Sequence, residues 1–154
     1  MLKVNDTAPD FKGTDQQGNT IQTSDFKGKK YVIYFYPKDN TPGCTAQACN
    51  LRDHYTTLLQ NGISIIGVSM DSEASHLKFI QKYELPFPLI ADTDRKIIET
   101  FGVWGPKKFM GREYDGIHRT TFLMNEENKI TGIITKPKTK YHAEEILELY
   151  NHPK

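Results

Sequence analysis

The stretch "YVIYFYPKDNTPGCTAQAC", residues 31–49, decides which fold and which chemistry we expect of this chain. Its first six residues are all β-branched or aromatic, as expected of a strand that is buried on both faces. After a short loop, Thr41 suits the N-cap of a helix and Pro42 its first position. The stretch therefore predicts a strand–loop–helix unit with Cys44 in the first turn of the helix.

The rest of the chain predicts a mixed sheet with helices on both faces. Alternating hydrophobic runs separated by turn residues give the order ββ, then βαβαβα, then ββα. Strands are expected at 10–14, 20–23, 31–36, 63–69, 87–92, 118–125 and 129–135, with the first two forming a hairpin. Helices are expected at 42–60, 72–83, 93–103 and 143–150, and the glycine-rich segment 103–116 is expected to be a long loop. This is an α/β fold with Cys44 beyond the C-terminal end of a central strand, where ligands collect in such sheets.

Length and composition restrict the class of protein. The chain has 154 residues, the size of one domain, and we expect a single domain over residues 1–154. A hydrophobic content of 37% argues against a disordered chain. A net charge of +1 shows no excess of basic residues of the kind that points to nucleic-acid binding. No apolar stretch is long enough to span a membrane or to form a signal peptide. We therefore expect a cytoplasmic protein, in which thiols stay reduced.

The chain has only two cysteines, Cys44 and Cys49. At the start of a helix, free backbone N–H groups and the helix dipole favour a thiolate over a thiol. A small buried hydrophobic residue is the simpler alternative for Cys44. Helical geometry places the two Cα atoms about 8.6 Å apart, beyond the limit of about 7 Å for a disulfide. A bond between them would require the first turns to unwind, which predicts a redox switch.

Other functions fit the same pair of cysteines. A zinc site needs about four ligands, but no second cysteine pair exists and the histidines are scattered at 54, 76, 118, 142 and 152. We therefore expect no metal, although a metal-binding module stays open. A thioredoxin-type dithiol lacks its Cys-x-x-Cys motif. A non-enzymatic redox sensor or holdase is a further alternative, because unwinding would expose apolar surface.

The spacing Pro37, Thr41, Cys44 matches the Pro-x-x-x-Thr-x-x-Cys pattern of the peroxiredoxins. The chain resembles their bacterioferritin comigratory protein (Q-type) branch, which often carries a second cysteine five residues later. Further matches are "APDF" at 8–11, "LRD" at 51–53 and "GVWGPKKFMGREYDGIHRTTFL" at 102–123, so the resemblance covers nearly the whole chain. It implies a thioredoxin-like fold and the reduction of hydroperoxides.

The resemblance also implies a role for each matching residue. Cys44 would be the peroxidatic nucleophile, and Cys49 the resolving thiol that forms an intramolecular disulfide. The hydroxyl of Thr41 would hydrogen-bond the thiolate and the peroxide, and Pro37 would shield the sulfur from water. Arg119 would stabilise the thiolate and orient the peroxide, although without the resemblance it reads as a surface arginine.

The remaining implications concern partners. Thioredoxin, or glutaredoxin, is the reductant that the resemblance implies, and no cofactor is required. The branch is commonly monomeric, so a monomer is expected. Trp104 is expected to be a packing anchor, and His54 and His118 ordinary surface or core groups.

Overall fold

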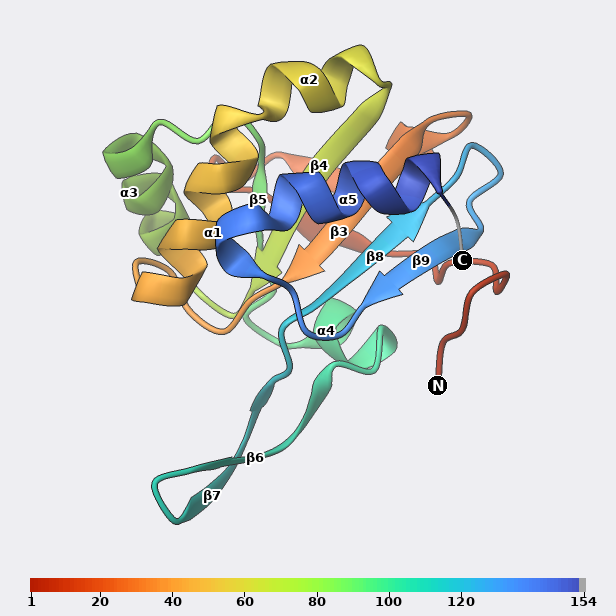
Figure 1. Ribbon diagram of the computed structural model, residues 1–154. Helices are drawn as coiled ribbons and strands as arrows, with labels where there is room; N and C mark the ends of the chain where they lie inside the picture. The colour runs from red at the N-terminus through yellow and green to blue at the C-terminus, as the bar shows by residue number, and fades with distance from the viewer. Residues whose placement is uncertain (153–154) are drawn as a thin grey trace.

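A five-stranded mixed sheet forms the centre of the computed structural model, which describes residues 1–152. The strand order is β5-β4-β3-β8-β9 (Figure 1). Their bounds are β3 Lys30–Phe35, β4 Ile63–Ser69, β5 Leu89–Ala91, β8 Thr120–Met124 and β9 Ile130–Ile134. Strand β3 is central, parallel to β4 and antiparallel to β8. The short strand β5 lies at one edge of the sheet and directly follows Pro86 and Pro88, and prolines are tolerated at such places.

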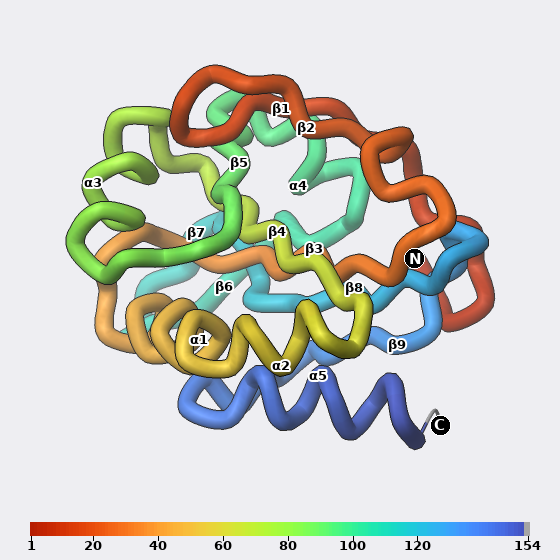
Figure 2. Tube along the Cα trace, turned by 90° about the horizontal axis from the view of Figure 1, so that it is seen from above, coloured from red at the N-terminus to blue at the C-terminus, as the bar shows by residue number. Residues whose placement is uncertain are grey.

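Helices lie on both faces of this sheet, as Figure 2 shows. One face carries α1 (Pro42–Asp53), α2 (Tyr55–Gln60) and α5 (His142–Asn151). The opposite face carries α4 (Lys96–Thr100) and the hairpin of β1 (Lys12–Thr14) and β2 (Thr20–Gln22), while α3 (Glu73–Tyr83) lies beside β5. Two 3₁₀ turns, η1 (Thr23–Phe26) and η2 (Thr139–Tyr141), complete the elements.

The core is split in two by the alternation of side chains along β3. Ile33 and Phe35 belong to the hydrophobic cluster under α4 and the N-terminal hairpin. Val32 and Tyr34 belong to the cluster under α1 and α5. Successive side chains of a strand point to opposite faces, so the five aromatic and β-branched residues from Tyr31 to Phe35 must be covered on both. This is the predicted thioredoxin-like fold with an N-terminal β-hairpin.

The single helix expected at 42–60 is in fact two helices. It breaks at His54, whose φ of −106° and ψ of 9° end α1 and precede α2. The ring Nδ1 of His54 lies 2.9 Å from the carbonyl oxygen of Asn50, which already accepts from the backbone N–H of His54 at 3.2 Å. The ring and the backbone N–H of His54 thus share one carbonyl oxygen at the break. The spacing of apolar residues along the helix does not reveal this arrangement.

The expectation of a long loop at 103–116 is wrong. This segment forms an antiparallel hairpin of β6 (Trp104–Phe109) and β7 (Arg112–Ile117) that extends away from the sheet (Figure 1). Met110 and Gly111 turn the chain with φ of 52° and 77°, as a two-residue hairpin turn requires. The strands pair only with each other and Phe109 is 64% exposed, so the alternating burial that marks a strand in sequence is missing.

None of the helices within residues 1–152 has the length and apolar character that crossing a lipid bilayer requires.

Candidate active site

Cys44 lies buried in the first turn of α1, directly after the loop that leaves β3. Arg119, which directly precedes β8, contacts it with Nη2 3.2 Å from Sγ. The sheet register explains this contact. Strand β8 pairs antiparallel with β3, and Phe35 lies opposite Thr120, so the residue before β8 is placed at the edge where α1 begins. The arginine that reads as a surface residue is therefore half-buried against the thiol.

Two further residues of α1, Gln47 and Gly43, determine the position of Arg119, and neither was expected from the sequence. The other guanidinium nitrogen, Nη1, donates a 2.7 Å hydrogen bond to Oε1 of Gln47, one turn after Cys44. Gly43 lies under the guanidinium, where an added Cβ would sit 3.2 Å from Nη2. The signal that could have found Gln47 is its i,i+3 spacing from Cys44, which puts both side chains on one helix face. Gly43 is identified only by the close approach of Arg119.

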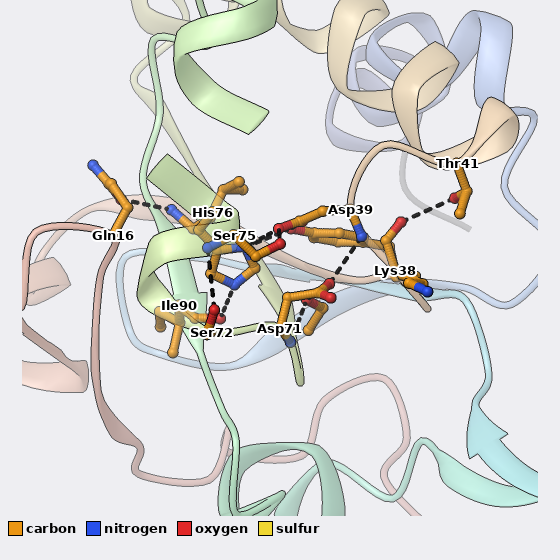
Figure 3. Close-up of polar contacts among 12 residues, drawn as sticks. Gln16, Lys38, Asp39, Thr41, Asp71, Ser72, Ser75, His76 and Ile90 are labelled. Atoms are coloured by element: carbon orange, nitrogen blue, oxygen red, sulfur yellow. Dashed lines mark hydrogen bonds and ion pairs between the residues drawn. The ribbon is translucent and has the colours of Figure 1, made fainter. Parts of the chain in front are cut away.

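Thr41 and Pro37 lie in the loop between β3 and α1. Thr41 occupies the N-cap position with extended backbone angles, as predicted, but its hydroxyl does not cap the helix. Instead, Oγ1 donates a 2.9 Å hydrogen bond to the carbonyl oxygen of Lys38 (Figure 3). Pro37 is half-buried next to Tyr36. The backbone of the loop, and not the helix, therefore holds the Thr41 hydroxyl.

Both cysteines are free thiols in this structure. Cys49 is half-buried, and both cysteines lie within α1. Asn50, the next residue, attaches this part of α1 to the start of α5 by accepting a 2.7 Å hydrogen bond from the backbone N–H of Ala143. The structure thus holds the dithiol state, with helix α1 intact between the two sulfurs.

A second cation and a tyrosine add to the electrostatics of the site. Lys107 of β6 donates from Nζ to the carbonyl oxygen of Ile117 at 2.8 Å. Burial lowers the pKa of Lys107, and the charge of Arg119 acts in the same direction, whereas Cys44 raises it. Burial raises the pKa of Tyr34 well above its usual value, and Cys44 adds to this effect, so Tyr34 is neutral at physiological pH. Lys107 was missed because its segment was expected to be a loop.

Neither cysteine belongs to the candidate metal-ligand group formed by Asp39, Asp71 and His76 among residues 1–152. The ring Nδ1 of His76 lies 2.7 Å from the Asp39 carboxylate. Two ligands each about 2.1 Å from a zinc ion would be farther apart than this. Asp39 and His76 therefore form a direct hydrogen bond in this structure, and their separation does not fit a zinc ion between them.

Fold and site together define a class: a thioredoxin-like α/β protein with a buried thiol at a helix N-terminus beneath an arginine. The AhpC/TSA family model matches residues 4–133. The chain is 49% identical over 147 residues to the putative peroxiredoxin bcp of Haemophilus influenzae, covering 96% of this chain and 95% of the relative. It is 44% identical over 146 residues to the peroxiredoxin Bcp of Escherichia coli, covering 95% and 94%.

The solved structures agree with this. The Xanthomonas campestris bacterioferritin comigratory protein, which has alkyl peroxide reduction activity, superposes with a TM-score of 0.87 at 32% identity, covering 100% of this chain and 99% of that chain. The chain therefore belongs to the AhpC/TSA family, in the Bcp (peroxiredoxin Q) branch of the peroxiredoxins, which confirms the resemblance seen in the sequence.

Proposed function

We propose that this peroxiredoxin reduces hydrogen peroxide and organic hydroperoxides with Cys44 as the nucleophile. The observation that carries the proposal is the 3.2 Å contact between Arg119 Nη2 and Cys44 Sγ at the start of α1. A guanidinium and a helix N-terminus both favour the thiolate, which is the reactive form of cysteine. The alkyl peroxide reduction activity of the related Xanthomonas protein supports organic hydroperoxides as substrates.

In the first step the thiolate of Cys44 attacks the terminal oxygen of the hydroperoxide. The new S–O bond forms as the O–O bond breaks, which gives a sulfenic acid and an alkoxide or hydroxide that takes up a proton. Arg119 and the free N–H groups at the start of α1 stabilise the charge that develops on the oxygens. The hydroxyl of Thr41 accepts from the peroxide. Its hydrogen is donated to the Lys38 carbonyl, so it is not available for the bond to the thiolate that the resemblance implies. Pro37 keeps water away from the sulfur.

In the second step Cys49 resolves the sulfenic acid. Its sulfur attacks Cys44 Sγ, the S–S bond forms, and the sulfenic oxygen leaves as water. Because both residues belong to α1 and helical geometry keeps their Cα atoms about 8.6 Å apart, the first turns of α1 must unwind before this step. The step therefore links catalysis to a local conformational change.

A dithiol protein then returns both cysteines to thiols. We propose thioredoxin for this role, with glutaredoxin as the alternative, and no cofactor takes part. We further propose that the chain acts as a single cytoplasmic domain over residues 1–154 and as a monomer.

Peroxide consumption measured by stopped-flow in the presence of reduced thioredoxin, with no small thiol added, tests the proposal. We expect Cys44→Ser to lose turnover, and Cys49→Ser to consume one equivalent and then stop unless a small thiol replaces the resolving cysteine. Unchanged steady-state turnover in Cys44→Ser would refute the proposal.

Mass spectrometry after one equivalent of peroxide tests the resolving step separately. We expect a loss of two hydrogens, located in the tryptic peptide that contains Cys44 and Cys49. A stable gain of one oxygen on Cys44, with Cys49 still a thiol, would rule out Cys49 as the resolving residue and leave the peroxidase proposal intact.

A further inference from the structure

A buried polar network lies on the far side of the loop that precedes Cys44, and its centre is Asp39 (Figure 3). The Asp39 carboxylate accepts a 2.6 Å hydrogen bond from the hydroxyl of Tyr36 and a 2.8 Å hydrogen bond from the hydroxyl of Ser75. It also contacts Nδ1 of His76 at 2.7 Å. The backbone N–H of Asp39 donates to the carboxylate of Asp71 at 2.8 Å. One loop residue is thus held by four partners.

His76 joins this loop to the rest of the fold. Its side chain is fully buried on α3, and its second ring nitrogen, Nε2, lies 2.9 Å from the carbonyl oxygen of Ile90 in β5. Both ring nitrogens therefore face acceptors, so Nε2 donates to the carbonyl and a proton is held between Nδ1 and the Asp39 carboxylate. A buried, fully hydrogen-bonded pair of this kind fixes geometry, because breaking it leaves an uncompensated polar group.

The network reaches the reacting atoms through the backbone of Lys38, the residue before Asp39. The carbonyl oxygen of Lys38 accepts the hydroxyl hydrogen of Thr41 at 2.9 Å. With its hydrogen engaged in this way, the Thr41 oxygen is left with lone pairs only, and it can act solely as an acceptor toward a ligand. A hydroperoxide carries one O–H donor, which matches this acceptor.

We propose that Asp39 and His76 are positioning residues for the peroxide step: they fix the Lys38 carbonyl, which sets the orientation of the Thr41 hydroxyl. This inference rests on the proposed peroxidase function. The atoms of the network belong to the loop, the β4–α3 connection, α3 and β5, and none belongs to α1. The network therefore survives the unwinding of α1, and the peroxide-contacting loop is already in place when α1 refolds.

The test compares two reactions of Cys44 in full-length protein carrying Cys49→Ser, so that only one thiol reacts. Peroxide needs an oriented Thr41 hydroxyl, whereas alkylation by iodoacetamide needs only a reactive thiolate. We expect Asp39→Asn to lower the second-order rate constant with peroxide about tenfold or more, and to leave the alkylation rate within about twofold. Asp94→Asn, an exposed carboxylate on the β5–α4 connection, is the matched control and should change neither rate.

A double-mutant cycle with Thr41→Val identifies the route. If Asp39 acts through Thr41, adding Asp39→Asn to Thr41→Val will cause little further loss of the peroxide rate. Fully additive losses, or an equal fall in peroxide and alkylation rates, would overturn the inference. Should Asp39→Asn fail to fold, Ser75→Ala removes one hydrogen bond to the same carboxylate and should show the same pattern at smaller size.

The outcome separates this inference from the proposed function. A parent protein that fails to react with peroxide would refute both, whereas a reactive parent with an equally reactive Asp39→Asn variant would refute the positioning role alone.

Discussion

Arg119 donates a 2.7 Å hydrogen bond from Nη1 to Oε1 of Gln47, and 72 residues separate the two in sequence. The same guanidinium places Nη2 3.2 Å from the sulfur of Cys44. Gln47 is fully buried, and its Nε2 has no hydrogen-bond partner among residues 1–152. Burying an amide with an unsatisfied nitrogen costs free energy. The hydrogen bond that the Gln47 oxygen accepts from Arg119 explains why this amide is nevertheless buried here.

Replacing Gln47 should therefore affect the peroxide step. A hydrogen bond to a charged group contributes about 1.5–3 kcal/mol, and about 1.4 kcal/mol corresponds to a factor of ten in rate. We expect Gln47→Ala to slow the reaction of Cys44 with peroxide about tenfold, measured by stopped-flow in single turnover. Gln47→Glu keeps an oxygen acceptor and should stay closer to the unsubstituted protein. A Gln47→Ala variant with an unchanged rate constant would show that Arg119 holds its place without the amide.

Gly43 should separate stability from activity. Alanine is a better helix former than glycine by about 1 kcal/mol, so Gly43→Ala should not lower the free energy of unfolding. Its Cβ, however, would lie 3.2 Å from Arg119 Nη2 and force the guanidinium to shift. We expect an unchanged or higher melting temperature together with a peroxide rate constant lower by about three- to tenfold. Equal activity at equal stability would mean that the guanidinium moves without cost.

Asn50 should control the resolving step. Its Oδ1 accepts from the Ala143 backbone at 2.7 Å and its Nδ2 donates to the Lys140 carbonyl at 2.9 Å. Since no side chain from the N-cap of α5 caps that helix, Asn50 serves as its cap. Unwinding α1 around Cys49 must break these bonds, because Asn50 is the adjacent residue.

We therefore expect Asn50→Ala to lower the free energy of unfolding by about 1 kcal/mol, as loss of a cap does, and to speed disulfide formation several-fold. Rapid quenching with an alkylating agent after one equivalent of peroxide, followed by mass spectrometry, measures the second quantity. Asn151→Ala, at the exposed end of α5, is the control. A disulfide step that is slower in Asn50→Ala than in the control would contradict the assignment.

His142 should make the fold less stable in mild acid. The ring is fully buried, with Nε2 2.8 Å from the Thr121 hydroxyl and Nδ1 3.0 Å from the Glu145 carboxylate. Burial lowers the pKa of His142 below its ordinary value of 6.5, and Arg119 acts in the same direction, against the Glu145 carboxylate, which raises it. The unfolded chain therefore binds more protons than the folded one as the pH falls through the ordinary histidine range.

By proton linkage, the free energy of unfolding should decrease as the pH is lowered below about 6.5. Chemical denaturation at several values between about pH 5 and 7.5 measures this slope. His142→Asn should be less stable at neutral pH but should lose part of the slope. An identical slope in the variant would assign the acid sensitivity to other groups.

The sequence alone was sufficient for the elements whose signals are local. The run 31–36 lacks polar residues, so it could only be a central strand, and the Thr-Pro-Gly-Cys order placed Cys44 at a helix start. The free N–H groups of that helix start, and the reactivity that they favour, follow from chain geometry without any partner. By contrast, the hairpin at 104–117 was not predicted. An exposed two-stranded ribbon has no buried face, so its sequence need not alternate between apolar and polar residues.

Tertiary structure decided which side chains meet Cys44. Arg119 reaches the site because β8 pairs with β3, and Lys107 does so because β6 and β7 pair as a hairpin. The Asp39–His76 pair exists because α3 packs over the loop. These contacts join residues 37 to 75 positions apart, as Asp39–His76 and Cys44–Arg119 show. Hydrophobic periodicity and helix capping depend on residues that are close together in sequence. The position of a charged side chain from a distant segment depends instead on strand register and helix packing, which no short window of sequence contains.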